Sequence, residues 1–200
     1  MLDSLLTQRP ELRALQSLAA RMLYRAGIRA DCATIMGGVL GVTAGFLFAR
    51  GDTAPGILAL ALSGGLDAVD GTVAREFERP TLLGGILDLT LDRVVEAAVL
   101  LGLIWLHPAL WLPAAVVLAT WYVNITAFMA TGSALGASEK LIHYPPGLVE
   151  RTEALLFFLL LALAPAFGAY LCYAYAALEV ATAIQRVVYA WRHLGASSDT

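Results

Sequence analysis

Six long apolar runs constrain this chain more than any other feature of its sequence. Most are close to the ~20 residues that an α-helix needs to cross a bilayer. Of the 200 residues, 59% are hydrophobic and only 14% are charged, which leaves too little polar surface for a water-soluble domain. The sequence therefore predicts an all-α integral membrane protein with six transmembrane helices. The runs are Ala33–Ala49, Ala54–Val73, Leu82–Leu106, Trp111–Thr131, Thr152–Ala169 and Tyr170–Ala190.

The boundary between the last two runs is the weakest of the set. Pro165 and Gly168 are the only residues there that favour a break in a helix. Proline inside a helix either ends it or kinks it. One long kinked helix over both runs is therefore the competing interpretation.

Basic residues lie almost entirely on one side of the six-helix arrangement. They gather in the N-terminal segment, in the loops after the second and fourth runs and after the sixth run, whereas the other side has only Arg50. Cytoplasmic loops of membrane proteins carry an excess of Lys and Arg. We therefore expect a bacterial inner-membrane protein with both termini in the cytoplasm.

The segment before the first run has the pattern of an amphipathic helix. Its apolar residues recur at helical spacing between residues 10 and 29, and Arg13, Arg21 and Arg25 point elsewhere. This pattern predicts a helix lying in the headgroup region of the cytoplasmic leaflet, although a soluble helix packed on the loops is an alternative. We expect three regions: an N-terminal segment over 1–32, a six-helix domain that carries the functional site over 33–192, and a disordered tail over 193–200.

Four aspartates lie in the second and third runs, where charge is costly. An ionised side chain within a span costs at least ~2.5–3.5 kcal/mol. Asp67 and Asp70 are three residues apart, and Asp88 and Asp92 are four apart, so each pair lies on one face of its helix. A short loop makes the two helices antiparallel neighbours. All four carboxylates are therefore expected to meet in one cavity that faces the cytoplasm.

A divalent cation would neutralise such a cluster. A site made only of oxygen atoms favours Mg²⁺ or Mn²⁺ over zinc, and Mg²⁺ often completes its shell with substrate phosphates. The alternative is a solvated helix end, or salt bridges to Arg75 and Arg79. Gly71 and Gly84 beside the acidic faces leave room for a nucleobase or pyrophosphate, or else for helix packing. Helix packing is the preferred interpretation for Gly37, Gly41 and Gly45.

The spacing of these residues resembles the signature of the CDP-alcohol phosphotransferase family. The pattern is Asp67-x2-Asp70-Gly71-x2-Ala74-Arg75-x8-Gly84-x3-Asp88-x3-Asp92, and every fixed position of the signature is matched. The resemblance implies that an alcohol hydroxyl displaces CMP from a CDP-linked lipid such as CDP-diacylglycerol, without a covalent enzyme intermediate. It also implies roles for the matched residues: Asp67, Asp70 and Asp88 would hold one or two Mg²⁺ or Mn²⁺ ions, Asp92 would be the base, and Gly71, Ala74, Arg75 and Gly84 would contact the nucleotide.

One stretch departs from the family pattern. Members of the family often have Pro-Asn-x-x-Thr just before the first span, whereas this chain has "ADCAT" over Ala30–Thr34. Asp31 and Thr34 have polar side chains at the positions where members of the family contact the nucleotide, so the resemblance implies that both bind the nucleotide. A helix N-cap is the alternative role for Asp31.

The acceptor must be recognised by residues outside the motif. Lys140, Arg151 and Arg186 are basic residues on the expected cytoplasmic side and are candidates for binding a phosphorylated polyol, such as inositol phosphate or glycerol phosphate. An unphosphorylated acceptor such as serine is the alternative. Basic residues next to a membrane also bind anionic lipid headgroups, which gives these three another explanation.

Two other classes of function remain as alternatives. A divalent-cation transporter would also place acids inside a helix bundle, but beyond Asp92 the third run offers only Glu96 before a wholly apolar stretch. A non-catalytic scaffold that keeps the motif is the other alternative. The family resemblance and the small residues of the spans favour a homodimer, and no nucleic-acid partner is expected.

Overall fold

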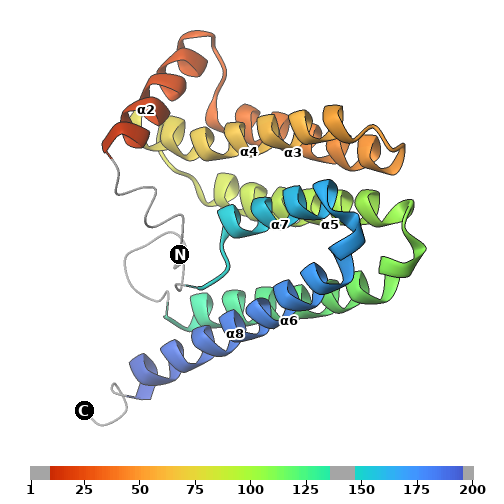
Figure 1. Ribbon diagram of the computed structural model, residues 1–200. Coiled ribbons are helices and arrows are strands. Elements are labelled where there is room, and N and C mark those ends of the chain that lie inside the picture. The colour runs from red at the N-terminus through yellow and green to blue at the C-terminus, as the bar shows by residue number, and fades with distance from the viewer. Residues whose placement is uncertain (1–9, 136–146, 196–200) are drawn as a thin grey trace.

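The computed structural model describes residues 10–135 and 147–195, and these residues form helices joined by short connections (Figure 1). Each of the six apolar runs coincides with one helix, and a further helix precedes them. Two short 3₁₀ helices, η1 at Pro108–Leu110 and η2 at Pro165–Phe167, lie before α6 and α8. The α-helices are α2 (Pro10–Arg25), α3 (Ala30–Ala49), α4 (Thr53–Glu76), α5 (Leu82–Trp105), α6 (Trp111–Leu135), α7 (Arg151–Leu163) and α8 (Gly168–Gly195).

Within the described ranges, which are all-helical, four helical segments are long and apolar enough to cross a membrane, so the chain is a membrane protein. The other two helices of the bundle differ from these four for separate reasons. Helix α5 carries four charged residues along its length, and α7 has only 13 residues. The four candidate spans are Ala30–Ala49, Thr53–Glu76, Pro108–Leu135 and Pro165–Leu194.

The last two helices are separate, so the interpretation of one long kinked helix is wrong. Helix α7 ends at Leu163, and α8 begins at Gly168 after the 3₁₀ turn. Proline has no N–H to continue the helix and disfavours helical geometry in the preceding residue, and Ala164 accordingly has φ −135°. The break therefore lies before the predicted boundary between Ala169 and Tyr170.

The C-terminal helix also extends further than predicted. Helix α8 continues through Gly195, so residues 193–195 are helical rather than part of a tail. Residues 196–200 lie outside the described part of the chain. The predicted tail is therefore shorter at its N-terminal side than the sequence suggested.

The helices are arranged in three layers. In Figure 1, α3 and α4 lie above, α5 and α7 lie between, and α6 pairs with α8 below. Helix α3 packs closely on both α4 and α5 because small residues let the backbones approach. A Cβ atom on Gly45 or on Gly102 would overlap the backbone of the other helix, and one on Gly41 would overlap Val95. The helix-packing interpretation of Gly41 and Gly45 is thus confirmed.

Aromatic side chains join the α6–α8 pair to α7. The ring of Phe157 stacks on that of Tyr175 with centroids 4.2 Å apart, and Trp121 meets both Phe158 and Tyr175 edge to face. These side chains are part of a continuous buried core that reaches Leu100 and Ile104 on α5. The core fixes α7, and therefore the residues at its start, against the rest of the bundle.

Helix α2 packs on the C-terminal end of α4. The Ser17 hydroxyl donates to Glu76 at 2.6 Å, and the rings of Tyr24 and Phe77 stack 5.1 Å apart. The helix ends at Arg25 rather than near residue 29 because Gly27 adopts a left-handed conformation with φ +81°. Several apolar side chains of α2 are exposed on its outer face: Leu15, Leu18 and Met22.

Candidate metal and nucleotide site

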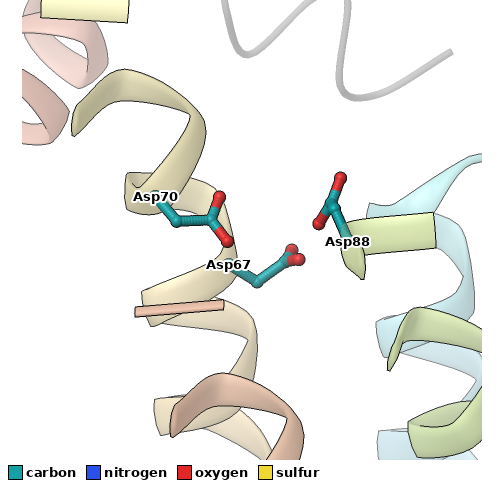
Figure 2. A group of neighbouring side chains, drawn as sticks. All are labelled: Asp67, Asp70 and Asp88. Atoms are coloured by element: carbon teal, nitrogen blue, oxygen red, sulfur yellow. The ribbon is translucent and has the colours of Figure 1, made fainter. Parts of the chain in front are cut away.

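Three of the four aspartates meet between α4 and α5. Figure 2 shows Asp67 and Asp70 on α4 pointing toward Asp88, which lies across the gap on α5. One carboxylate oxygen from each lies within 4.8 Å of the others. Carboxylate oxygens at this spacing suit a hard divalent cation such as Mg²⁺ or Mn²⁺. The convergence predicted for four aspartates is therefore found for these three.

An arginine from a third helix lies inside this acidic cluster. The Arg151 guanidinium contacts Asp67 Oδ2 at 2.7 Å through Nη1, and it contacts Asp88 Oδ1 at 3.3 Å and Asp92 Oδ2 at 3.1 Å through Nη2. The same Nη1 lies 3.5 Å from the main-chain oxygen of Asp67. Arg151 is expected from the sequence among the residues that bind the acceptor, whereas the structure brings it to the carboxylates themselves.

The backbone at the start of α7 is fixed by a capping box. Glu150 occupies the N-cap, its side chain accepts from the backbone at Glu153, and the Glu153 side chain accepts from the N–H of Glu150 at 3.2 Å. Arg151 is the first residue of the helix that these bonds define. Its long side chain is 41% exposed, and the head group reaches the carboxylates from a backbone that these bonds fix.

Asp92 lies one helical turn beyond Asp88 and shares Arg151 with it. Its side chain is 24% exposed, and Arg93 Nη2 lies 3.9 Å from its Oδ2. Arg93 itself pairs more closely with Glu96 at 2.9 Å. Within the described residues, the salt bridges of the cluster go to Arg151 and Arg93, and none goes to Arg75 or Arg79. The salt bridges to Arg75 and Arg79 that the alternative interpretation expected are therefore not found.

A cavity of about 520 Å³ opens beside the carboxylates, a size typical of small-molecule sites. All six residues expected to bind the nucleotide line it, together with Asp70 and Asp88. Further lining residues, which the motif does not predict, lie in the connections that flank it and include Arg29, Glu78 and Thr81. The six predicted residues are Asp31, Thr34, Gly71, Ala74, Arg75 and Gly84.

Local contacts organise the wall of this cavity. The Thr34 hydroxyl donates to Asp70 Oδ2 at 2.7 Å, so α3 orients a carboxylate of α4. A Cβ atom on Gly84 would lie 3.1 Å from Asp31 Oδ1, which shows how closely the starts of α3 and α5 approach. Helix α3 begins at Ala30 with Arg29 in the N-cap position, so the N-cap alternative for Asp31 is wrong.

A second polar cluster lies between α6 and α8. Arg186 is only 9% exposed, and its Nη1 donates to Asn124 Oδ1 at 2.6 Å. The Asn124 amide donates in turn to Glu179, and the Arg186 guanidinium lies over the ring of Phe128, 4.8 Å from its centroid. In the described part of the chain, Arg186 Nε is buried without a hydrogen-bond partner.

Arg186 is predicted from the sequence as a residue that binds the acceptor, whereas no role is predicted for Asn124 or Glu179. A carboxylate within an apolar run was an available signal for Glu179, because such residues in membrane helices are costly and usually have a partner. Arg151 and Arg186 thus belong to different clusters. Lys140, the third residue predicted to bind the acceptor, lies outside the described residues.

Comparison with known proteins agrees with the motif. A family model described as CDP-alcohol phosphatidyltransferase matches residues 28–190. A phosphatidylinositol phosphate synthase of Mycobacteroides abscessus is 35% identical over 68% of this chain, but the match spans only 63% of that relative. An archaetidylinositol phosphate synthase of Methanothermobacter thermautotrophicus is 32% identical over 85% of this chain and 87% of its own length.

Solved structures of a phosphatidylinositol phosphate synthase from Mycobacterium tuberculosis share this fold. The structure with CDP-DAG bound is 26% identical, with a TM-score of 0.72, and the match covers 89% of this chain and 94% of that one. The structure in complex with manganese and citrate is 27% identical, with the same TM-score, and covers 88% of each chain.

Proposed function

Because the chain belongs to the CDP-alcohol phosphatidyltransferase family, we propose that it transfers the phosphatidyl group of a CDP-linked lipid to inositol phosphate and releases CMP. The family resemblance expected from the eight-residue motif is thereby confirmed. The observation that carries the proposal is the meeting of the acidic cluster with the neighbouring cavity, which the predicted nucleotide residues line. The names of the relatives support inositol phosphate as the acceptor.

We propose that the cavity receives the CDP part of the donor. Gly71 and Gly84 carry no side chain to fill the space, and Arg75 supplies a positive charge at its wall, where phosphate is expected. Asp67, Asp70 and Asp88 would hold Mg²⁺ or Mn²⁺, which stabilises negative charge on phosphate oxygens when bound. A solved relative crystallised with manganese supports this choice of metal.

Asp92 is proposed to take the proton from the attacking hydroxyl. It lies one helical turn along α5 from Asp88, so its carboxylate lies on the same face of the helix as that of Asp88, one turn further from the start of α5. Its Oδ2 is held by Arg151 at 3.1 Å, which orients the carboxylate, while its partial exposure leaves room for an acceptor. A general base contributes typically 10²–10⁴-fold to a rate. The reaction then proceeds by direct attack of the acceptor oxygen on the phosphorus, with CMP as the leaving group.

Basic residues are proposed to select the phosphorylated acceptor. Arg151 lies beside Asp92, where the attacking hydroxyl is expected, and Arg186 supplies a second guanidinium from α8. Lys140 remains a predicted contributor. Guanidinium groups bind phosphate with paired hydrogen bonds, whereas serine would offer these residues only a singly charged carboxylate next to a positive ammonium group.

We also propose the topology and assembly expected from the sequence. All six helices from α3 to α8 would cross an inner membrane, with α7 and the 3₁₀ turn after it forming the shortest span. The start of α7 and the C-terminal end of α8 lie on the same side of Figure 1 as α2, and the loop bearing Arg50 lies on the opposite side. This arrangement supports a cytoplasmic site and termini, with α2 at the interface. The homodimer remains a prediction that light scattering of the purified protein would test.

An acceptor screen tests the proposed reaction. Detergent-solubilised protein would receive CDP-diacylglycerol, Mn²⁺ or Mg²⁺, and either inositol phosphate, glycerol phosphate, serine or inositol, with CMP release as the measurement. We expect release with inositol phosphate and its loss when EDTA is added. Release with serine or inositol, and none with inositol phosphate, would contradict the acceptor assignment. Metal-dependent flux across liposomes without CMP release would instead favour the transporter.

A further inference from the structure

Arg151 binds the same carboxylates that were assigned to a divalent cation. Its Nη1 contacts Asp67 Oδ2 and its Nη2 contacts Asp88 Oδ1, and both residues belong to the group of three carboxylates that lie close enough to share an ion. A guanidinium and a divalent cation repel one another and draw on the same negative charge. The guanidinium and the cation therefore cannot both bind Asp67 and Asp88 strongly at the same time.

We propose that Arg151 and the divalent cation compete for Asp67 and Asp88, and that binding of the cation releases the guanidinium toward the phosphate of the acceptor. The second half of this inference rests on the function proposed above, and the first half does not. The exchange makes the acceptor site depend on a loaded metal site. It gives one arginine two successive partners, first carboxylates and then phosphate.

The charge of the cluster favours such an exchange. Four carboxylates face one guanidinium, with Arg93 only at the margin and paired with Glu96. A divalent cation at Asp67, Asp70 and Asp88 would satisfy more of this negative charge than Arg151 does. The hold of Asp67 and Asp88 on Arg151 then weakens, Asp92 remains its carboxylate partner, and the freed donors can turn to a substrate phosphate.

The placement of Arg151 permits the movement. The capping box fixes the backbone at the start of α7, but the guanidinium stands at the end of a long flexible side chain that is 41% exposed. Arginine also binds phosphate and carboxylate with the same planar arrangement of donors. No helix has to shift for the head group to change its partner.

Thermodynamic linkage allows the exchange to be measured either through the affinity for the cation or through the affinity for the acceptor. If the cation releases Arg151 for the acceptor, then the cation raises the affinity for the acceptor, and the acceptor raises the affinity for the cation by the same factor. Removing Arg151 should abolish this coupling. It should also tighten metal binding in the absence of any substrate, because the competitor is gone.

The first test measures Mn²⁺ binding by electron paramagnetic resonance in purified protein without substrates. We expect Arg151→Gln to bind Mn²⁺ about five- to tenfold more tightly than the unaltered protein, within the usual range of couplings between sites. Arg93→Gln is the matched control, because it removes the same charge near Asp92, whereas the salt bridges of Arg93 among the described residues go to Asp92 and Glu96 rather than to Asp67 or Asp88. Unchanged or weaker binding in Arg151→Gln, or equal tightening in Arg93→Gln, would overturn the competition.

A conservative variant covers the case in which Arg151→Gln does not fold. The ammonium group of Arg151→Lys keeps the charge but cannot bridge Asp67 and Asp88 as two Nη atoms do, so we expect it also to bind Mn²⁺ more tightly. Gel filtration would establish that each variant is folded. Binding of Mn²⁺ by the folded lysine variant that is no tighter than normal would overturn the proposal in the same way.

The second test measures binding of inositol phosphate by calorimetry, with and without Mn²⁺ and without any CDP-lipid, so that no turnover occurs. We expect Mn²⁺ to raise the affinity at least fivefold in the unaltered protein and to leave it unchanged in Arg151→Gln. Inositol serves as the acceptor without phosphate and should show no such effect. If Mn²⁺ binding tightens in the variant while inositol phosphate never binds, the proposed acceptor fails and the competition stands.

Discussion

The two polar clusters of this bundle both place charge among apolar helices, but they balance it differently. The cluster on α4 and α5 has four carboxylates, and the three that pair with Arg151 are 16–29% exposed. The cluster on α6 and α8 has one carboxylate, Glu179, and one guanidinium, Arg186, with Asn124 between them. Glu179 is only 3% exposed.

This difference separates a site that needs a cation from a link between helices whose charges balance. Glu179 and Arg186 join α6 and α8 through Asn124, and among the described residues only the Nε of Arg186 in this link has no hydrogen-bond partner. An excess of negative charge beside an open cavity requires a cation and favours a ligand that brings phosphate. The balance of charge, together with exposure, therefore indicates which cluster carries the chemistry.

The largest expected effect comes from the acidic cluster. Asp92→Asn removes the proposed base while keeping the size of the side chain, so we expect CMP release to fall by roughly 10²–10⁴-fold. Binding of a CDP-lipid should change little because Asp92 does not line the nucleotide cavity. The rate of CMP release in detergent and donor binding by calorimetry check the two expectations.

Asp52→Asn is the matched control for this substitution. Asp52 pairs with Arg50 at 3.3 Å, outside the residues that form the acidic cluster and its cavity. We expect its rate to be normal. A normal rate in Asp92→Asn as well would show that the base is another residue.

An intermediate effect is expected from a residue that orients a carboxylate. Thr34→Val removes the hydroxyl that donates to Asp70 Oδ2 at 2.7 Å and keeps the shape of the side chain. Loss of a hydrogen bond behind a metal ligand typically lowers metal affinity or activity ~10–100-fold. Titration with Mn²⁺ would measure it, and Thr43→Val on the same helix is the control, because its exposed hydroxyl bonds only to its own backbone at Val39. Equal affinities in the two variants would remove Thr34 from the site.

The smallest effect is expected from the balanced cluster, and it should be on stability. Asn124→Leu deletes the acceptor for Arg186 and the donor to Glu179, at a cost of roughly 1 kcal/mol for each hydrogen bond between membrane helices. Thermal unfolding followed by tryptophan fluorescence would report the loss. Mn²⁺ affinity should not change. A variant that lost Mn²⁺ binding but kept its stability would contradict the division between the two clusters.

Much of the fold could be predicted because membrane helices depend on length and apolarity. All six helices fall on the predicted runs, since lipid favours helices that satisfy their own backbone hydrogen bonds. The ends were less predictable. Helix α7 ends at Leu163 because Pro165 disfavours helical backbone geometry in Ala164. At the other end of the chain, the polar residues did not end α8 before Gly195.

The candidate site also has a part that could be predicted from the sequence and a part that could not. The motif residues could be found because their spacing is local: residues three or four apart share a helix face, and a short loop brings the faces together. The place of Arg151 could not be found by this reasoning, since it depends on how α7 packs against α4 and α5. Glu179 and Asn124 were missed for a related reason, because their partnership exists only once α6 and α8 are side by side.

The contact between Gly45 and Gly102 has a consequence for insertions. Because neither position has room for a side chain, α3 cannot slide along α5, and the register of the two helices is set far from the cavity. Asp31 and Thr34 face that cavity only while the turns between them and Gly45 are intact. One residue inserted between Thr34 and Gly45 would rotate both side chains by about 100° about the helix axis. The length of α3 is thus as much a part of the nucleotide site as the residues that line it.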